Sequence, residues 1–351
     1  MKKSRIISLL LIIVMVGAIF VGCNRENRGN DNNVSSNINE SNNEGEKENK
    51  DPETNKAVSE YGVTINDDNV VFTDARGEEV TIKKLPRKVV CLYNSYLDIW
   101  DSCGGEVIGR VEESEEKPVE KAMSAEVVGT SGAPSLEKVL ALEPDLVIVT
   151  NGFKVQAEMV PVLEQNNIQV ISLGNDYLED YYKTVRLFTA ITDREDLYEK
   201  HINEVKKGVD AIIEKAPKDK NYKTLIVFAS AKSITVRNSE SMVGEMLKDL
   251  NTINISDGET DPANAKVFSM EKIIQEDPDF IFVQTMGSDK EKIMERLKQD
   301  VEDNPAWASL TAVKEGRYIV LPKDLYLYKP NARYAEAYEG LAKILYPEIF
   351  N

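Results

Sequence analysis

The sequence has few of the side chains that bind metals or attack substrates. Its 351 residues contain one histidine, His201, and three cysteines. Zinc and manganese sites usually gather several imidazole, thiolate or carboxylate ligands, so one histidine in a predicted helix, where we expect it to be solvated, argues against capture of a bare metal ion. Ser230 and Ser233 have no partner histidine, and the chain has no P-loop or Gly-x-Gly-x-x-Gly motif. We therefore expect no enzymatic activity.

The chain also lacks an excess of positive charge. Its 43 Lys and Arg residues stand against 60 Asp and Glu residues, which gives a formal net charge of −17. A chain this acidic does not attract nucleic acid or anionic lipid through a broad electrostatic field. We expect no nucleic-acid partner.

One long apolar run is present, at the N-terminus. Residues 6–20 are uncharged, follow a short basic segment and are too few for a membrane-spanning helix, which predicts a signal peptide over residues 1–22. The run leads into Gly22-Cys23, which resembles the bacterial lipobox, so Cys23 is predicted to be lipidated. An ordinary secretory cleavage site or an uncleaved anchor is the alternative.

Residues 23–57 are rich in Asn, Glu, Ser and Lys and have almost no apolar side chains. Such a segment cannot bury enough surface to offset its ordering entropy, so we expect a flexible tether. A coil of about 35 residues has a root-mean-square reach of roughly 30–35 Å. The folded part is thus predicted to lie at the outer face of the cytoplasmic membrane, held by lipid on Cys23.

Cys91 and Cys103 are the cysteines of the folded part. Cys91 falls near the end of a predicted strand and Cys103 near the end of the following helix, positions that are usually far apart in a βα unit. A disulfide is chemically possible outside the cytoplasm. We nevertheless expect two buried free thiols.

Beyond residue 57, short apolar runs alternate with amphipathic stretches such as 159–165. Residues 70–73 and 79–82 flank Asp-Ala-Arg-Gly and predict a β-hairpin. Further strands are predicted at 88–92, 107–109, 146–149, 169–173, 224–229, 280–283 and 318–321. This alternation predicts an α/β fold with parallel sheets covered by helices.

One stretch of the sequence occurs twice. Residues 135–149 align with residues 269–283, with matching Ser, Glu, Lys, Pro and Asp positions. Each copy predicts a Ser-capped helix, a Pro-Asp turn and a buried strand. Two copies so far apart predict two lobes of similar design, and convergence on a common helix-turn-strand pattern is the alternative.

Residues 178–215 have apolar side chains at helical spacing and predict one nearly continuous helix between the lobes. At about 1.5 Å per residue, its last 20 residues alone would span about 30 Å. We expect a stiff connection with little hinge motion. The predicted boundaries are 58–177 for the N-terminal lobe, 178–216 for the inter-lobe helix and 217–351 for the C-terminal lobe.

Several short motifs follow one another in a distinctive order. They are Thr-Asp-Ala-Arg-Gly at 73–77, Gly-Thr at 129–130, the first copy of the repeat, Asn-Pro-Ala-Trp at 304–307, Ala-Val-Lys-Glu-Gly-Arg at 312–317 and Leu-Pro-Lys-Asp at 321–324. From about Val63 to Ile349 the chain resembles the helical-backbone binding proteins of ABC importers for ferric siderophores, haem and cobalamin. The resemblance implies two Rossmann-like lobes joined by one long helix, with the ligand between loops at the carboxyl ends of the sheets.

The resemblance also implies a docking role for two glutamates. In that family one surface glutamate of each lobe docks into arginine pockets of the permease, and the repeat carries these roles to Glu137 and Glu271. An acidic residue early in a helix also stabilises the positive helix end, which is the alternative role. The implied partners are the permease and ATPase subunits of an ABC importer.

Loops that follow the predicted strands supply the candidate ligand contacts. In the first lobe these are Tyr93, Asn94, Ser95, Tyr96, Ser131, Asn151 and Phe153. In the second lobe they are Lys232, Arg237, Met286, Tyr326, Tyr328 and Arg333, with Lys329 and Asn331 beside them. Aromatic rings give flat contact area at low entropic cost, and Arg or Lys neutralises an anionic chelate. Any one of these tyrosines is alternatively a core or rim residue.

The expected ligand is an anionic ferric siderophore, because the candidate loops offer cations and no histidine. Haem held by Tyr or Met, and cobalamin, are alternatives within the same importer class. A surface binding or signalling lipoprotein that does not serve transport is a further alternative. No cofactor is expected, and no metal bound directly by the protein.

Overall fold

The computed structural model describes residues 58–112, 118–174, 177–258, 269–287 and 289–351. The predicted signal peptide, the lipid acceptor Cys23 and the tether lie outside these residues. All of the described residues belong to one compact unit. Within this part of the chain, none of the helices combines the length and apolarity needed to cross a bilayer.

The described chain begins with a four-stranded antiparallel meander. Its strands pair in sequence order and are β1 (Val58–Glu60), β2 (Val63–Ile65), β3 (Asn69–Thr73) and β4 (Glu79–Lys83). The predicted hairpin is confirmed as β3 and β4. Its turn is fixed by Asp74, whose carboxylate accepts a hydrogen bond from the backbone N–H of Arg76 at 2.8 Å.

The first lobe is built on a five-stranded parallel sheet in the order β11-β10-β5-β6-β7. The strands are β5 (Val89–Cys91), β6 (Gly109–Arg110), β7 (Glu126–Val127), β10 (Leu146–Thr150) and β11 (Gln169–Leu173), and β8 (Gly129–Thr130) and β9 (Ala133–Pro134) form a separate hairpin. The helices are α1 (Asn94–Ser102), the 3-10 turn η1 (Glu120–Ala122), α2 (Leu136–Ala141) and α3 (Lys154–Gln165). Alternate strand residues face α1 on one side and α2 with α3 on the other.

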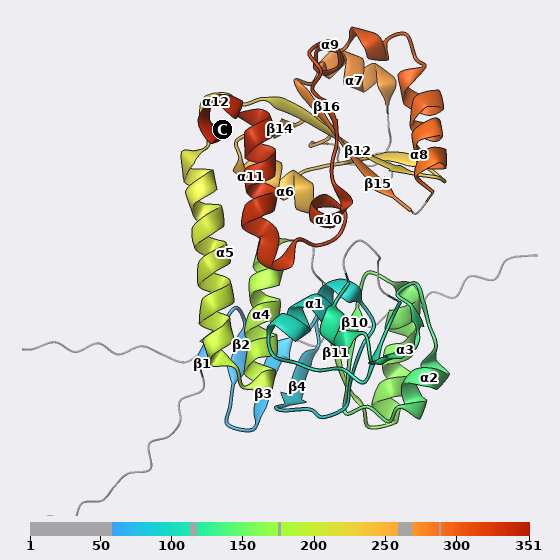
Figure 1. The fold of residues 1–351 in the computed structure, drawn as a ribbon, viewed down its shortest axis with the longest axis vertical. Helices are drawn as coiled ribbons and strands as arrows, with labels where there is room; N and C mark the ends of the chain where they lie inside the picture. Colours follow the sequence, from blue (N-terminus) through green and yellow to red (C-terminus); the bar gives the residue numbers. More distant parts are fainter. Residues whose placement is uncertain (1–57, 113–117, 175–176, 259–268, 288) are drawn as a thin grey trace, which may run out of the picture. The chain divides into compact units, whose positions relative to one another are not determined.

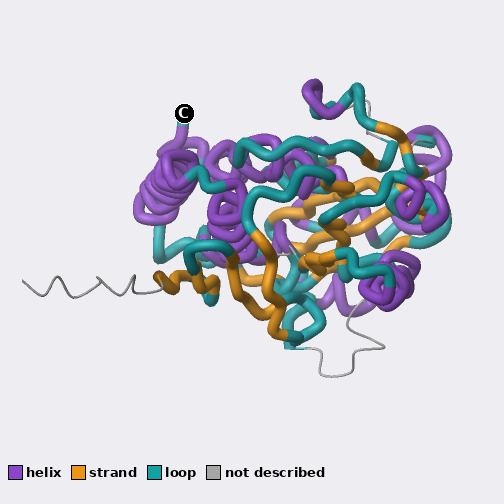
Figure 2. The backbone as a smooth tube through the Cα atoms, turned by 90° about the horizontal axis from the view of Figure 1, so that it is seen from below, coloured by secondary structure: helices purple, strands orange, loops and turns teal. Residues whose placement is uncertain are grey.

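The second lobe has its own five-stranded sheet in the order β13-β12-β15-β16, with β14 also paired to β12. The strands are β12 (Lys223–Ser230), β13 (Ile234–Arg237), β14 (Ile253–Asn254), β15 (Phe280–Met286) and β16 (Tyr318–Val320). All neighbours are parallel except β12 and β13, which are antiparallel. Seen from below, most strands run through the middle of the molecule and helices lie around them (Figure 2). The prediction of two lobes on separate, largely parallel sheets is confirmed.

Helices cover both faces of the second sheet. They are α6 (Met242–Asp249), α7 (Met270–Glu276), α8 (Lys290–Leu297), the π-helical turn η2 (Lys298–Glu302), the 3-10 turn η3 (Trp307–Ser309), α9 (Thr311–Lys314), α10 (Lys323–Tyr326), the 3-10 turn η4 (Asn331–Arg333), α11 (Tyr334–Leu345) and α12 (Pro347–Phe350). Residues of α7, α8 and α9 share a core with one face of the sheet, and residues of α6 and α11 with the other.

The prediction of one nearly continuous helix over residues 178–215 is wrong. Helix α4 (Leu178–Thr192) ends at Asp193, whose backbone is left-handed with φ 57° and ψ 39°, and α5 (Glu195–Lys215) begins after it. The two helices pack against each other (Figure 1). At about 1.5 Å per residue, α5 alone is about 30 Å long, and it runs beside α4 and α11. The long connection between the lobes is therefore one arm of a helical hairpin.

A single apolar cluster, here called the shared core, runs through both lobes. It includes Ile148 of β10, Phe188 of α4, Val209 of α5, Phe282 of β15 and Leu341 of α11, all fully buried. Helix α11 packs along α5 and joins this cluster to the second sheet (Figure 1). Separating the lobes would expose the shared core, so apolar burial holds them together.

The two copies of the repeat fold alike. Ser135 and Ser269 each cap a helix by accepting a hydrogen bond from the backbone N–H three residues on. Asp145 accepts from the N–H of Lys88 at 3.0 Å, and Asp279 accepts from the N–H of Lys223 at 2.8 Å. In both lobes the Pro-Asp turn thus ties its strand to the start of the neighbouring strand.

The two cysteines of the folded part are free and buried, as predicted. Cys91 ends β5, and Cys103 follows the last residue of α1. Burial raises the pKa of each thiol to about 12. A neutral thiol is a poor nucleophile and a poor metal ligand, so both behave as small core side chains.

Candidate ligand site

The parallel strands of the first sheet bring predicted ligand residues to one edge. Strands β5 and β10 pair in parallel, so their carboxyl ends meet at the same edge of the sheet. Tyr93 and Asn94 follow β5, Asn151 and Phe153 follow β10, and Ser131 lies at the tip of the β8–β9 hairpin. Ligands of open α/β sheets bind outside this edge.

An aromatic group lies at this edge. The ring of Tyr93 meets the rings of Tyr96 at 5.0 Å and Phe153 at 6.1 Å between centroids, both edge-on. Tyr93 and Phe153 are partly exposed, whereas Tyr96 is 1% exposed and its hydroxyl donates to the carbonyl of Leu173 at 2.9 Å. Ser95 is also buried. Neither Tyr96 nor Ser95 offers surface to a ligand in this structure, which corrects that expectation.

Tyr326 of the second lobe is likewise a core residue. Its side chain is 3% exposed and its hydroxyl donates to the carbonyl of Ala337 at 2.9 Å. Its own carbonyl accepts a hydrogen bond from the side chain of Gln284. The expectation that Tyr326 contacts the ligand is corrected in the same way, while Tyr328 stays partly exposed.

Strands β12 and β15 pair in parallel along their length and bring their carboxyl ends to one edge of the second sheet. Met286 ends β15 and is 51% exposed, and Lys232, in the turn after β12, is also exposed. Strand β13 runs antiparallel to β12, so its last residue, Arg237, pairs with Ile226 and lies away from this edge. Its guanidinium lies over the ring of Phe228, 4.1 Å from the centroid.

Arg237 is a cation without a carboxylate partner among the described residues. Burial is the one cause that moves the pKa of Arg237, and it lowers that pKa. Since burial disfavours the charged form, an anion placed beside this guanidinium would be bound more strongly than in water. The ligand-binding role of Arg237 stays a prediction, because its place along β13 separates it from the carboxyl ends of β12 and β15.

Arg333 is already neutralised. Its guanidinium pairs with Asp324 at 2.9 Å and Glu336 at 2.7 Å. Hydrogen bonds to Glu336 and Asp324 raise the pKa of Arg333 against the effect of burial. An anionic ligand would have to compete with two carboxylates here, so the structure does not favour the predicted role of Arg333.

Asn331 joins the two lobes. Its side-chain amide donates to the carbonyl of Ser95 at 2.9 Å and to the carboxylate of Asp98 at 2.6 Å, both on α1. The side chain is 2% exposed, and the backbone has a positive φ of 53°. Asn331 was expected beside the ligand contacts, and in this structure it bonds to the helix that follows the Tyr93 loop.

His201 is not a simple solvated helix residue, which corrects the sequence prediction. It is partly buried, and its Nε2 lies 3.1 Å from the carbonyl of Ser102 at the end of α1. The residues that the structure describes contain no group of three or more His, Cys, Asp or Glu side chains able to hold a metal ion.

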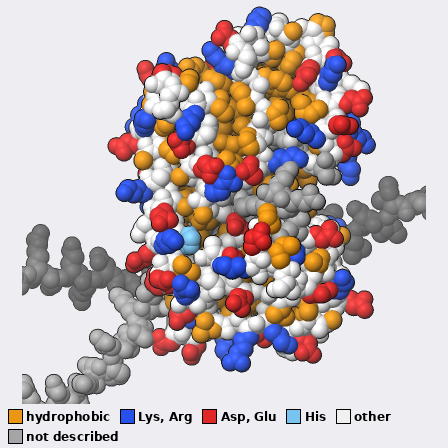
Figure 3. Space-filling view, viewed as in Figure 1, with side chains coloured by type: hydrophobic (Ala, Val, Ile, Leu, Met, Phe, Trp, Pro, Cys, Tyr) orange, Lys and Arg blue, Asp and Glu red, His pale blue; other side chains and the backbone are white. Residues whose placement is uncertain are grey.

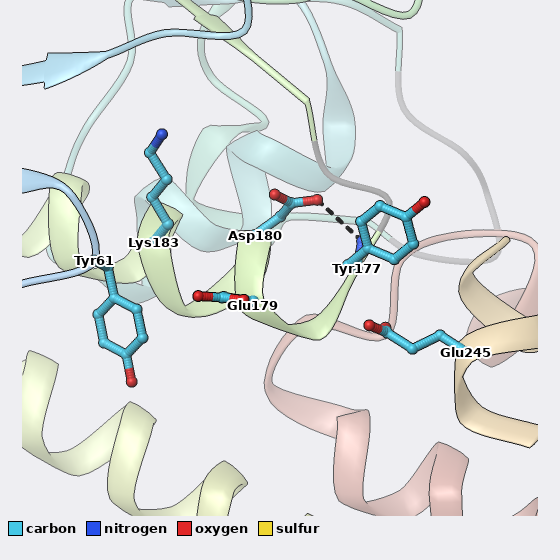
Figure 4. Close-up of a pocket in the computed structure, with 6 residues that line it drawn as sticks. All are labelled: Tyr61, Tyr177, Glu179, Asp180, Lys183 and Glu245. Carbon is cyan, nitrogen blue, oxygen red and sulfur yellow. Dashed lines mark hydrogen bonds between the residues drawn. The ribbon is translucent and has the colours of Figure 1, made fainter. Parts of the chain in front are cut away.

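A pocket of about 230 Å³ lies where α4 begins (Figure 4). It is lined by Tyr61, Tyr177, Glu179, Asp180, Lys183 and Glu245. Glu245 points from α6 toward the first turn of α4 and accepts a hydrogen bond from the backbone N–H of Leu178 at 3.0 Å. Three carboxylates against one lysine do not suit an anionic chelate, and none of these residues was predicted to bind ligand.

Charges of both signs are mixed over the face seen in Figure 3, on both lobes. No broad basic field is present on this face, which agrees with the acidic net charge of the chain. On this face, individual cations and not a broad basic field would attract an anion.

The sequence pattern of the family described as periplasmic binding protein matches residues 89–325. The chain belongs to the periplasmic binding protein family. The Fe(3+)-citrate-binding protein YfmC of Bacillus subtilis is 26% identical over 302 residues, which cover 83% of this chain and 89% of that protein. The iron(3+)-hydroxamate-binding protein FhuD of the same organism is 28% identical over 273 residues, which cover 73% and 80%. The family resemblance found in the sequence is confirmed.

The fold agrees with this membership. The crystal structure of Staphylococcus aureus SirA complexed with staphyloferrin B covers 79% of this chain and 97% of its own, with a TM-score of 0.62 and 23% sequence identity. The structure of petrobactin-binding protein YclQ from Bacillus subtilis covers 81% and 99%, with a TM-score of 0.62 and 21% identity. At this identity the likeness establishes the two-lobe fold of a periplasmic binding protein.

Glu137 and Glu271 occupy equivalent places in this periplasmic binding protein. Each is the second residue of its helix, and both side chains are exposed. None of the ion pairs between described residues involves either carboxylate. Each lobe therefore exposes one carboxylate at the same position of the repeat, the second residue of a Ser-capped helix.

One residue of the candidate site was missed by the sequence interpretation. Gln156 is fully buried in α3, and its side chain hydrogen-bonds three backbone groups at the loop edge of the first sheet. The sequence held a signal, because Gln156 stands at helical spacing with the buried apolar residues Met159, Val160 and Leu163. A polar side chain on the core face of a helix needs hydrogen-bond partners.

Proposed function

We propose that this protein is the substrate-binding component of an ABC importer and that it captures a ferric chelate outside the membrane for delivery to the permease. Membership of the periplasmic binding protein family over residues 89–325 carries the proposal. It is supported by relatives named for binding ferric citrate and ferric hydroxamate. The protein acts by binding and release, without turnover of its ligand.

The proposed ligand is anionic, and two cations of the second lobe support this choice, Lys232 near the carboxyl edge of the sheet and Arg237 farther along β13. The guanidinium of Arg237 is half-buried, backed by Phe228 and not paired with a carboxylate among the described residues. Lys232 is an exposed cation in the turn between β12 and β13. Tyr93, Asn94, Ser131, Asn151 and Phe153 form the proposed surface of the first lobe, and Met286 and Tyr328 complete that of the second.

Attachment to the membrane is proposed to use lipid on Cys23. The B. subtilis relative YvrC, 26% identical over 307 residues, is named an ABC transporter substrate-binding lipoprotein, which supports this assignment. The permease and ATPase subunits of the importer are the proposed partners. Residues 23–57 would then be the tether between lipid and folded body.

Titration calorimetry with ferric citrate, ferrioxamine B, haemin and cyanocobalamin tests the ligand class. We expect saturable binding of an anionic ferric chelate with about one ligand per chain and no chemical change of the ligand. Calorimetry is preferable to intrinsic fluorescence, because Trp100 and Trp307 are both buried, at 1% and 3% exposed. Tighter binding of haemin or of the corrinoid than of the ferric chelates would overturn the proposed ligand.

Docking of the permease is proposed to use Glu137 and Glu271. Replacing both by alanine is expected to leave chelate affinity unchanged and to reduce cellular uptake by more than about 10-fold, since paired charges set register and partner choice. Glu291→Ala is the matched control, because Glu291 is also the exposed second residue of a helix, α8, but lies outside the repeat. Normal uptake by the double variant would remove the docking assignment.

A further inference from the structure

Gln156 ties together the three loops that form the first-lobe half of the proposed ligand site. Its Oε1 accepts a hydrogen bond from the N–H of Thr150 at 2.9 Å, at the end of β10. Its Nε2 donates to the carbonyl of Leu92 at 2.8 Å, directly after β5, and to the carbonyl of Ser131 at 2.7 Å, at the tip of the β8–β9 hairpin. One side chain thus reaches three segments that are far apart in the sequence.

The chemistry of these contacts fits an amide and no other side chain of that size. Two of the partners are carbonyl oxygens and one is an N–H, so the side chain must donate twice and accept once. This pattern also fixes the orientation of the amide, because a flipped group would place its oxygen against two carbonyl oxygens. A glutamate would set a buried negative charge against the same two oxygens.

The loops held by Gln156 carry the predicted ligand residues of the first lobe. Leu92 precedes Tyr93 and Asn94, Thr150 precedes Asn151, and Ser131 is itself a candidate contact. The hairpin also approaches the aromatic group, since a Cβ at Gly132 would lie 4.0 Å from the ring of Phe153. Among the hydrogen bonds between described residues, only those of Gln156 join Ser131 to the other two loops.

We propose that Gln156 is a positioning residue that sets the spacing of these three loops and thereby the preference of the protein among ferric chelates of different size. The proposal rests on the proposed function, because it assumes that these loops contact the ligand. Gln156 itself is fully buried and does not touch the ligand. Its effect acts through Tyr93, Ser131 and Asn151, whose separation depends on the three hydrogen bonds.

The test compares Gln156→Leu with Gln169→Leu. Gln169 is a matched control in the same lobe, because its side chain also bridges backbone groups, accepting from the N–H of Lys83 and donating to the carbonyl of Thr81. It is the first residue of β11 and so lies at the opposite edge of the sheet from the loops. Both variants lose backbone hydrogen bonds, and only the first loses those of the proposed site.

The first measurement needs no ligand. Hydrogen exchange, followed by mass spectrometry on the full chain, is expected to speed up at residues 89–97 and 126–135 by about 10-fold in Gln156→Leu and not in Gln169→Leu, since unpaired backbone groups favour local opening. Equal exchange in both variants at these segments would overturn the positioning role, whether or not the protein binds a chelate.

The second measurement is the ratio of Kd values for ferric citrate and the larger ferric enterobactin, which are both anionic. Gln156→Leu is expected to weaken binding of the preferred chelate by roughly 10-fold and to change the ratio, which a uniform loss of folded protein does not do. Gln169→Leu is expected to keep the ratio of the wild type. An unchanged ratio with faster loop exchange would overturn the link to specificity, and failure of the wild type to bind either probe would count against the proposed function instead.

Discussion

Two arginines with the same predicted role have different surroundings in the folded protein. Arg237 lies against the Phe228 ring without a carboxylate partner among the described residues, whereas Arg333 is held by Asp324 and Glu336. The positive charge of Arg237 is therefore available to an anionic ligand, whereas that of Arg333 is already neutralised by two carboxylates. The difference depends on neighbours contributed by other elements, which the position of an arginine in the sequence does not reveal.

We expect Arg237→Gln to weaken binding of an anionic ferric chelate by about 10-fold or more, because one half-buried charge contact is lost. Arg333→Gln is expected to leave the affinity within about twofold and to cost at most about 1 kcal/mol of stability, since its ion pairs are partly exposed. Titration calorimetry and urea unfolding measure the two effects. Equal weakening by both substitutions would show that Arg333 also serves the ligand.

At the scale of elements, the break between α4 and α5 decides how the lobes are joined. The chain reverses at Asp193, where the left-handed backbone ends α4, and Glu195 and Asp196 open α5. Acidic residues in a first turn complement the positive helix end, so the sequence contained a start signal for α5. The sequence interpretation missed this signal because apolar residues recur at helical spacing through both helices. They do so because α4 and α5 each bury one face in the shared core.

A glycine at position 193 should therefore be better tolerated than an alanine. Asp193→Gly is expected to be more stable than Asp193→Ala by roughly 1 kcal/mol, because only glycine adopts the left-handed conformation without steric cost. Both variants lose the same 3.8 Å pair with Lys84, so that contact cancels in the comparison. Urea unfolding gives the free energies, and an alanine variant as stable as the glycine variant would contradict the assigned backbone.

The contact of Asn331 with α1 is a second link between elements. Asn331→Gly removes the hydrogen bonds to Ser95 and Asp98 but permits the positive φ of 53°. We expect a loss of about 1–3 kcal/mol in urea unfolding, because a buried hydrogen-bonded amide is removed. Asn331→Ala should lose roughly 1 kcal/mol more through backbone strain. A glycine variant with wild-type stability would mean that the link contributes nothing.

At the scale of the whole molecule, the shared core makes the two lobes one folding unit. Its residues come from both sheets and from α4, α5 and α11. The described residues accordingly form one compact unit and not two. A ligand held between such lobes meets surfaces whose spacing is largely set before binding, which lowers the ordering cost of capture.

One tryptophan in each lobe allows this to be tested. Trp100 belongs to α1 of the first lobe and Trp307 to η3 of the second, and both are buried. In Trp100→Phe and Trp307→Phe variants the remaining tryptophan reports one lobe, and we expect coincident transitions when each variant is followed by fluorescence and by circular dichroism. Fluorescence that changes well before or after the circular dichroism signal would show that the lobes unfold separately.

The longer strands, the Ser-capped repeat helices and the two-lobe architecture followed from the sequence, because they depend on local spacing of apolar residues and on capping residues such as Ser135 and Ser269. The sequence interpretation missed the strands β1, β2, β7, β8, β9, β13 and β14 and the end of α4, since strands of two to four residues and a helix end at Asp193 leave little local pattern. Among the site residues, sequence reasoning found the loops but not which of their side chains stay exposed.

Local order along the chain thus determined the family, the positions of the longer strands and the duplicated helix-turn-strand unit. Only the tertiary structure decided that Tyr96 and Tyr326 belong to the core, that Arg333 is neutralised and that Gln156 holds three loops. The physical reason is that burial, ion pairing and shared hydrogen bonds are properties of residues brought together from distant segments. The spacing of residues within one segment of the sequence does not show which distant residues become neighbours in the folded protein.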